Sequence, residues 1–248
     1  RSTLRRPDRG VERVTDMSDA SEGSPKLLRP RDASTLIIVR KGRNGGEVLM
    51  GERSAAHVFV PENFVFPGGR VDRSDAFVQP ATPLRPEVLE RLQKTATPRR
   101  ALALAMAAVR ETFEETGLIV GGRTEAAAKP GRAPKGWQHF LSTGMAPALG
   151  GLTYVARAVT PTGRPRRFNA RFFVVDADAI TGEVADSDEL LTVRWFSLPE
   201  ARKLKIRPIT ELVLAEIEAR LAEDSLHAPE RPAPAFTVRQ GRRNVVYE

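Results

Sequence analysis

The stretch Arg110-Glu111-Thr112-Phe113-Glu114-Glu115-Thr116-Gly117-Leu118 is the most informative part of this 248-residue chain. If it is helical, Glu111, Glu114 and Glu115 share one face, because residues three and four apart are neighbours on a helix. Like charges in that arrangement repel one another, and a hard divalent cation with oxygen ligands relieves the repulsion. The pattern therefore indicates a metal site, although a solvated acidic face is the alternative that this stretch alone leaves open.

A glycine turn lies upstream of the acidic stretch, in the run Phe64-Val65-Phe66-Pro67-Gly68-Gly69-Arg70-Val71-Asp72. The run begins as a β-prone segment and breaks at Pro-Gly-Gly, where paired glycines allow close approaches that other residues do not. An apolar, alanine-rich run, residues 101–109, then leads into the acidic stretch. A strand, a glycine turn and a helix with clustered carboxylates form a layout suited to holding a metal ion and a phosphate side by side.

These two segments resemble the signature of the Nudix hydrolase family, G-x5-E-x7-R-E-U-x-E-E-x-G-U, in which U is a bulky aliphatic residue. The second half is matched from Arg110 to Leu118, except that Thr112 replaces an aliphatic residue, and Gly69 matches the first half. Gly69 and Arg110 are 41 positions apart where the signature allows 14, so an insert separates the halves. Counted back from Arg110, the first glutamate of the signature falls on Leu102, and that glutamate is therefore missing.

The insert, about residues 73–100, is rich in proline and is predicted to be a loop with one short helix near residues 86–94. An F-P-G-G-x-x-D run, a long insert and an R-E-x-x-E-E-x-G block together resemble a subgroup of the family that includes relatives of the peroxisomal coenzyme A diphosphatases. Arg53-Ser54 followed by Phe59 and Pro61, and the run of residues 166–173, also resemble that subgroup.

The resemblance implies a fold, a cofactor and an activity. The fold is an α/β (α+β) sandwich of the Nudix type, with a mixed sheet between helices and a proline-rich insert inside the signature. The cofactor is Mg²⁺ or Mn²⁺, which carboxylate ligands suit, bound by Glu111, Glu114, Glu115 and the Gly69 carbonyl. The activity is hydrolysis of a diphosphate linkage in a nucleoside diphosphate derivative. Coenzyme A or an acyl-CoA is the leading substrate, and NADH, ADP-ribose, nucleotide sugars and capped RNA are less favoured.

A second function stays open beside this enzyme. A catalytically weak, Nudix-type nucleotide- or RNA-binding regulatory module would fit the missing glutamate and the positive charge of the chain. The intact set of three glutamates argues against it, because a module without metal chemistry has no reason to tolerate their repulsion.

Further candidate residues accompany the three glutamates. Arg110 precedes Glu114 by four residues and can hold the carboxylates in register, or form an ordinary surface salt bridge. Four loop carboxylates are candidates for a catalytic base: Glu183, Asp186, Asp188 and Glu189. We choose Glu189, and a solvated acidic loop is the alternative. Guanidinium groups match phosphate oxygens, so the candidates for substrate binding are Arg53, Arg164, Arg166, Arg167 and Arg171. Phe168 is a candidate stacking residue, and a place in the core is its alternative. For each arginine, surface solvation is the alternative.

The composition excludes several other classes of protein. The chain has no cysteine, which rules out disulfides, thiolate zinc sites and cysteine nucleophiles. Its three histidines are scattered, so a histidine metal cluster is not expected. Its longest apolar run, residues 101–109, is too short to span a bilayer, and no secretory signal is visible. We therefore expect a cytoplasmic protein without a membrane partner.

The formal net charge of +8 attracts polyanions in general. No nucleic-acid-binding motif is present, and Trp and Tyr are scarce, so we expect a nucleotide-type small molecule and no specific nucleic acid as partner. A homodimer stays open, since no apolar stripe demands one.

A mixed order of strands and helices is predicted along the chain. Residues 1–30 are expected to form a disordered basic extension, with Met17 as a plausible natural start, residues 31–228 the catalytic domain, and residues 229–248 a tail with a small hairpin around Gly241. Strands are expected at residues 35–39 and 47–52, consistent with a hairpin around residues 42–46, and at residues 65–66 and 192–196. Strands at residues 152–160 and 170–176 are expected to flank a basic turn at residues 162–167. Helices are expected at residues 98–116 and 208–222, and a further helix opens at Ser197.

Overall fold

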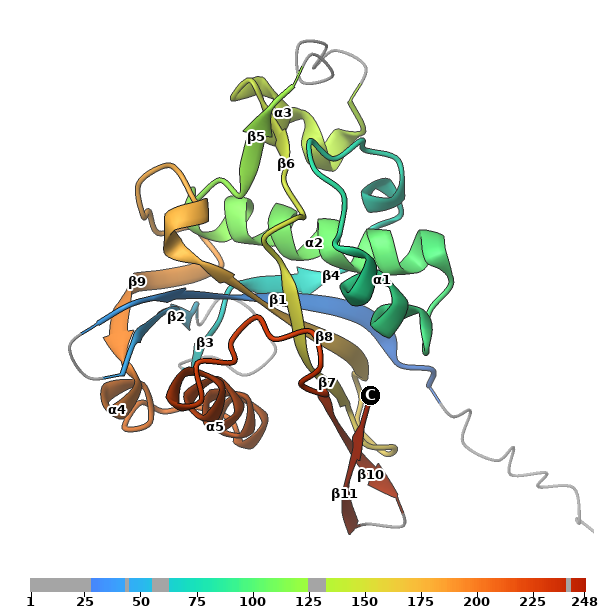
Figure 1. Ribbon diagram of the computed structural model, residues 1–248, viewed down its shortest axis with the longest axis vertical. Helices are drawn as coiled ribbons and strands as arrows, with labels where there is room; N and C mark the ends of the chain where they lie inside the picture. The colour runs from blue at the N-terminus through green and yellow to red at the C-terminus, as the bar shows by residue number, and fades with distance from the viewer. Residues whose placement is uncertain (1–27, 43–44, 55–62, 125–132, 240–241) are drawn as a thin grey trace, which may run out of the picture.

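A mixed sheet of nine strands runs through the part of the chain that the computed structural model describes, residues 28–42, 45–54, 63–124, 133–239 and 242–248 (Figure 1). The strands follow one another in the order β11-β10-β7-β8-β1-β2-β3, while β4 also pairs with β1 and β9 also pairs with β2. Their bounds are β1 (Arg31–Arg40), β2 (Glu47–Arg53), β3 (Phe64–Val65), β4 (Gly68–Arg70), β7 (Thr153–Val159), β8 (Phe168–Asp176), β9 (Leu190–Ser197), β10 (Pro234–Arg239) and β11 (Arg242–Tyr247).

Two hairpins predicted from the sequence are present in this sheet. β1 and β2 pair antiparallel, with Val39 opposite Val48, and β7 and β8 pair antiparallel on either side of residues 160–167. β8 runs parallel to β1, with Phe168 opposite Arg31. The first residues of β1 and β8 therefore lie at the same end of the sheet.

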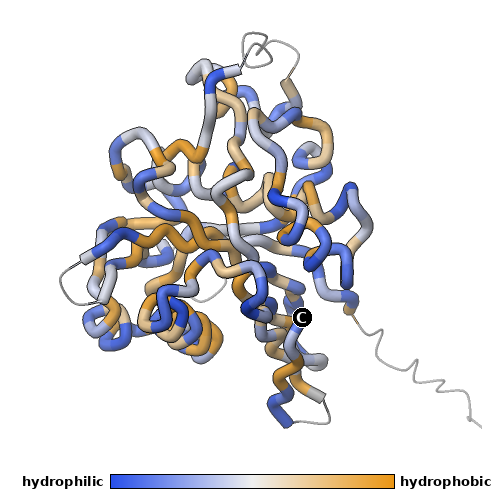
Figure 2. Tube along the Cα trace, viewed as in Figure 1, coloured by the Kyte–Doolittle hydropathy of each residue, from blue (hydrophilic) through white to orange (hydrophobic). Residues whose placement is uncertain are grey.

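Helices cover both faces of the sheet, which makes three layers (Figure 1). One face carries α1 (Pro86–Gln93), α2 (Pro98–Thr116) and α3 (Gln138–Ser142), and the other carries α4 (Leu198–Ala201) and α5 (Pro208–Ala222). Because side chains alternate along a strand, Leu36 and Ile38 pack in the core on the α2 side, whereas Ile37 and Val39 pack on the α5 side. Figure 2 shows hydrophobic residues along the central strands and the helices that pack on them. The predicted α/β/α sandwich with a mixed sheet is confirmed.

The long helix α2 has the bounds that the sequence predicts, and so has α5. The Thr97 hydroxyl accepts a hydrogen bond from the Arg100 N–H (3.4 Å), and Pro98 occupies the first turn, where its missing N–H is tolerated. Gly117 ends α2 in the left-handed region (φ 73°), which glycine adopts readily. These end signals place the acidic stretch in the last two turns of α2.

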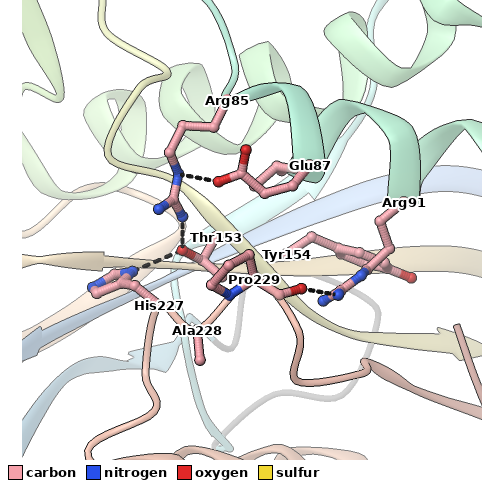
Figure 3. Close-up of a pocket in the computed structure, with 9 residues that line it drawn as sticks. Arg85, Glu87, Arg91, Thr153, Tyr154, His227, Ala228 and Pro229 are labelled. Carbon is pink, nitrogen blue, oxygen red and sulfur yellow. Dashed lines mark hydrogen bonds and ion pairs between the residues drawn. The ribbon is translucent and has the colours of Figure 1, made fainter.

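Figure 3 shows where the insert meets the C-terminal segment. Arg91 of α1 donates a hydrogen bond to the Pro229 carbonyl, and Arg85, directly before α1, donates one to the Thr153 hydroxyl (2.6 Å). The same hydroxyl is hydrogen-bonded to Nδ1 of His227 (2.7 Å). The cavity between these side chains has a volume of about 10 Å³, which is room for one water at most. This junction therefore fastens the insert to the sheet and is too small for a ligand.

The C-terminal segment also contributes to the sheet. β10 pairs in parallel with β7, with Phe236 opposite Ala158, and β11 pairs antiparallel with β10. The predicted hairpin is therefore present, and the segment predicted as a tail supplies two strands of the main sheet.

Some predictions concern residues outside the described ranges, namely those for residues 1–27 with Met17, and for the motif residues Phe59 and Pro61. Among the described helices, none combines the length and the apolar character that crossing a bilayer requires.

Candidate active site

The double glycine of β4 lies against the acidic end of α2. β4 pairs with β1, which places Gly68 opposite Thr35 and Gly69 opposite Ser34. A Cβ atom on Gly69 would lie 2.3 Å from Oε2 of Glu111, far inside van der Waals contact. A Cβ on Gly68 would lie 2.5 Å from the carbonyl oxygen of Ser34. Gly68 is required because backbone atoms of β1 lie this close, whereas at Gly69 the atoms in the way are the end of the Glu111 side chain.

We expect the Gly69→Ala variant to fold and to lose most of its activity. The added methyl group overlaps the Glu111 carboxylate, which is the end of a flexible side chain and moves away more easily than backbone does. Glu111 would then leave its place beside Glu115. Thermal melting and turnover check this result, and Gly151→Ala is the matched control, since a Cβ there meets Val175 at an ordinary 3.6 Å. Equal turnover in the two variants would contradict the assignment of Glu111.

Glu115 is the most enclosed of the three carboxylates. Its side chain is buried, and its Oε2 accepts a hydrogen bond from the Gly68 N–H (2.8 Å). Burial raises the pKa of Glu115 to about 8, against the lowering effect of that hydrogen bond, and the negative charge of Glu111 adds to the rise. The protein therefore holds this carboxylate where its charge is poorly solvated.

Glu111 and Glu114 lie beside Arg110. Burial raises the pKa of Glu111 to about 7, although the charge of Arg110 and a hydrogen bond from it act in the opposite direction. Glu114 is half-exposed, and burial is again the largest cause of its raised pKa. Nη1 of Arg110 donates to Oε1 of Glu111 (2.8 Å) and Oε2 of Glu114 (2.9 Å). The predicted pairing of Arg110 with Glu114 is present.

Arg110 is buried, so it is more than the surface salt bridge that the sequence also allowed. Its Nη2 donates to the Arg70 carbonyl (3.0 Å), which ties α2 to β4. Burial alone would lower the pKa of Arg110, but hydrogen bonds to Asp75 and the charges of Glu111, Asp75 and Glu114 together raise it. Arg110 therefore stays charged and fixes the positions of two glutamates.

Asp75 completes this network, and sequence reasoning missed it. The side chain is fully buried, and its Oδ1 accepts hydrogen bonds from Nε of Arg110 (2.8 Å) and Nε1 of Trp137 (3.0 Å). Asp75 belongs to a short 3-10 helix, η1 (Arg73–Ala76), and Trp137 to another, η4 (Lys135–Trp137).

The spacing of Asp75 corrects the conclusion that the first acidic residue of the signature is missing. Asp75 follows Gly69 by six positions, which is the G-x5-E spacing, with aspartate in place of glutamate. Counting back from Arg110 reaches Leu102 instead, because the insert lies after Asp75 and before Arg110. Counting forward from Gly69 would have found Asp75.

The loop before β9 lies against the end of α2 (Figure 1). The Ala185 N–H donates to the Thr116 carbonyl (2.9 Å), and the Ser54 N–H donates to the Glu189 carbonyl (3.0 Å). The charge of Glu189 is among the causes that raise the pKa of Glu114 and Glu115, so its carboxylate lies near both.

The other predicted residues near this loop lie in three different surroundings. Arg53, the last residue of β2, lies near Glu115, whose pKa its charge lowers. The Asp186 carboxylate instead accepts hydrogen bonds from the backbone N–H groups of Thr192 (2.9 Å) and Val193 (2.8 Å), so it shapes the loop. Glu183 and Asp188 are exposed.

The arginines around the β7–β8 turn lie away from the glutamates. Phe168 opens β8 beside Arg31, and Arg100 in the first turn of α2 is paired with Asp32, so this end of the sheet lies near the start of α2. Glu111 is eleven residues further along α2, roughly 16 Å at 1.5 Å per residue. The structure does not bring Arg164, Arg166, Arg167 and Phe168 together with the carboxylates.

Arg171 does not grip a phosphate, and that prediction is wrong. Its side chain is buried and paired with Asp32 (3.1 Å), and it donates to the Thr95 hydroxyl (3.2 Å). The arginine thus joins β8 to β1 and the insert. Its sequence position beside Phe172 and Phe173 in a buried strand already favoured such an internal role.

The carboxylates fit a hard divalent cation by their chemistry. In the described part of the chain, no three acidic or histidine side chains already converge as a ready-made metal site, and Arg110 bridges Glu111 and Glu114 instead. The glutamates nevertheless offer carboxylate oxygens beyond those that Arg110 and Gly68 engage, and burial together with mutual repulsion raises their pKa values. A cation held by oxygen ligands would relieve that repulsion.

Comparison with known proteins gives two informative similarities. No protein-family model matches the chain. An acyl-coenzyme A diphosphatase of Gallus gallus, NUDT19, is 27% identical over 240 residues, which cover 72% of this chain and 64% of that protein. The chain thus spans less than two thirds of the length of this curated relative. The crystal structure of a NUDIX hydrolase from Alicyclobacillus acidocaldarius matches with a TM-score of 0.60 and 28% identity, covering 80% of this chain and 96% of the other.

Proposed function

Because the chain belongs to the Nudix hydrolase family, we propose that it hydrolyses the diphosphate linkage of a nucleoside diphosphate derivative with the help of Mg²⁺ or Mn²⁺. Water adds across the P–O–P linkage, and two phosphate esters leave. The reaction needs no oxidant or reductant.

The observation that carries this proposal is that the buried Glu115 and the partly buried Glu111 lie against the double glycine. Two neighbouring carboxylates with raised pKa values cost folding stability at neutral pH, and a protein that only needed a stable helix would place them in water. A cation-dependent reaction gives this arrangement a purpose.

Glu111, Glu114, Glu115 and the Gly69 carbonyl would hold the cation. When bound, it supplies positive charge to the phosphate oxygens and lowers the pKa of a coordinated water. Arg110 keeps Glu111 and Glu114 in place through its two hydrogen bonds, and Asp75 keeps Arg110 in place. Glu189 is our candidate for the group that accepts the proton of the attacking water, since it lies near Glu114 and Glu115.

Coenzyme A or an acyl-CoA is the proposed substrate, because the curated relative is an acyl-coenzyme A diphosphatase. NADH, ADP-ribose and nucleotide sugars are the other members of the class. The residues proposed to bind the substrate are Arg53, Arg164, Arg166 and Arg167, with Phe168 as a stacking residue. Of the four arginines, Arg53 lies near the carboxylates.

A substrate panel tests the function. Coenzyme A, acetyl-CoA, NADH, ADP-ribose and a nucleotide sugar are incubated with the protein, with Mg²⁺ or with a chelator, and the phosphate esters released are measured. We expect product from coenzyme A compounds with Mg²⁺ and none with the chelator. Binding without product for every compound would overturn the proposal in favour of the regulatory module. An affinity for RNA that falls steeply as the salt concentration rises would indicate an RNA-binding module.

A further inference from the structure

A second cavity lies beside the first turns of α2, outside the carboxylate cluster. Its volume is about 490 Å³, within the range of small-molecule sites. It opens between the start of α2 and the segment that follows β4. Its walls include Asp72, Arg73 and Ala76 from that segment, Thr97 directly before α2, and Arg99, Arg100 and Ala103 of α2.

The residues that line this cavity carry more positive charge than is usual beside the N-terminus of a helix. The N-terminus of a helix carries partial positive charge and normally attracts acidic residues. The first turn of α2 has no acidic residue and instead carries Arg99 and Arg100. Arg73 faces them across the cavity, and three arginines meet one aspartate among the lining residues. A bound anion would neutralise charge that the chain itself leaves unbalanced.

The polar groups around the cavity leave the arginines available. The Asp72 carboxylate accepts a hydrogen bond from the Ser74 N–H (2.7 Å) and caps η1. Asp32 accepts a hydrogen bond from Nε of Arg100 (2.6 Å), which leaves the terminal nitrogens of that guanidinium to face another acceptor. Three guanidinium groups on two rigid elements suit a phosphate, whose oxygens accept several such hydrogen bonds.

Aromatic packing holds one of the arginines at the cavity. The guanidinium carbon of Arg99 lies 4.5 Å from the centre of the Phe77 ring, and Phe77 is an exposed aromatic residue. This cation–π contact orients Arg99 without removing its hydrogen-bond donors. Arg99 is therefore positioned in advance, which lowers the entropy lost when an anion binds.

The cavity and Glu114 lie along one face of α2. Arg99, Ala103, Arg110 and Glu114 are spaced by four, seven and four residues, so they form one stripe along α2. Arg73 and Ala76 line the cavity, while Asp75 between them holds Arg110. Ala103 and Glu111 are about 12 Å apart along the helix at 1.5 Å per residue. One extended ligand can therefore contact both places.

We propose that this cavity binds a phosphate monoester. The inference rests on the proposed function for one of its two sources, a phosphate that the substrate itself carries away from the diphosphate. Coenzyme A has such a group on its ribose, and dephospho-coenzyme A lacks it. The other source is a separate phosphate compound that binds beside the substrate.

The test compares two double variants with the same loss of charge. Arg73→Gln/Arg99→Gln removes two exposed cavity arginines. The control, Arg207→Gln/Arg242→Gln, removes one exposed arginine directly before α5 and one on β11. Dissociation constants for coenzyme A and dephospho-coenzyme A are measured by calorimetry with a chelator present, so that no turnover is needed. We expect the wild type and the control to prefer coenzyme A by about tenfold, and the cavity variant to lose that preference with unchanged affinity for dephospho-coenzyme A.

Inorganic phosphate separates the two sources. One outcome is that phosphate raises the melting temperature of the wild type and the control but not that of the cavity variant, while each protein has equal dissociation constants for coenzyme A and dephospho-coenzyme A. That result would support the site and identify its ligand as a separate phosphate compound. Equal coenzyme ratios together with equal responses to phosphate would overturn the proposal. A coenzyme preference lost only in the cavity variant would support the site even if no diphosphate is hydrolysed, so its failure and that of the proposed function are distinguishable.

Discussion

The Glu115→Gln variant is expected to lose about three orders of magnitude in kcat. A negatively charged ligand that holds a catalytic cation contributes several kcal/mol to stabilisation of the transition state, and each 1.4 kcal/mol of activation free energy changes the rate about tenfold. The change keeps the shape of the side chain and the acceptor for the Gly68 N–H, so the fold should be retained. The same variant is expected to be more stable than the wild type when no metal is present. Turnover under saturating Mg²⁺ and thermal melting with a chelator check the two halves of this prediction.

The pH dependence of that stability gain has a definite sign. Glu115 has a pKa of about 8 in the folded protein, against an ordinary value of 4.5. A carboxyl with a raised folded pKa favours the fold when protonated, so its contribution is lost as the pH rises from 4.5 through 8. Glutamine is neutral throughout, and the gain of the variant should be absent below pH 4.5 and largest above pH 8.

The matched control for this variant is Glu90→Gln, which removes one charge from an exposed position of α1. We expect it to change neither turnover nor the melting temperature measurably. Saturating Mg²⁺ should raise the melting temperature of the wild type and of this control but not of Glu115→Gln, since only a bound cation stabilises the folded state. Retained turnover in Glu115→Gln would remove the carboxylate cluster as the reaction centre.

The long helices could be predicted from the sequence because their signals are local. Pro98 in the first turn and Gly117 after the last turn mark the ends of α2, and the apolar spacing of residues 208–222 marks α5. The β1–β2 and β7–β8 hairpins join neighbouring segments and followed from turn residues in the same way.

The sheet order could not be predicted, because it depends on contacts between distant segments. β10 pairs with β7 although 74 residues separate the end of one from the start of the other. The local sequence of neither segment indicates which strand it pairs with. The parallel pairing of β1 with β8 is equally invisible to local patterns.

In the candidate site too, residues in local motifs could be predicted, whereas residues that depend on long-range contacts could not. The three glutamates and Gly69 come from short, specific motifs, and the structure brings them together. Asp75, Arg110 and Trp137 are far apart in the sequence and meet only in the folded chain, so local patterns did not reveal the roles of Asp75 and Trp137. The arginines near Phe168 were grouped with the site because guanidinium groups match phosphate oxygens and because residues 166–173 resemble the subgroup. The turn that carries them lies at the other end of α2.

The Asp75→Asn variant is expected to lose about 3–5 kcal/mol of folding stability, because it leaves the buried Arg110 without its main counter-charge. For a chain of this size that corresponds to a fall of about 10 °C in melting temperature. Turnover should fall as well, since Arg110 would shift towards Glu111 and Glu114 and draw them from the cation. Asp72→Asn, three residues earlier on the exposed cap of η1, is the control and should melt within about 2 °C of the wild type, since asparagine is as good a helix cap as aspartate. If both variants melted together, Asp75 would not be the main counter-charge of Arg110.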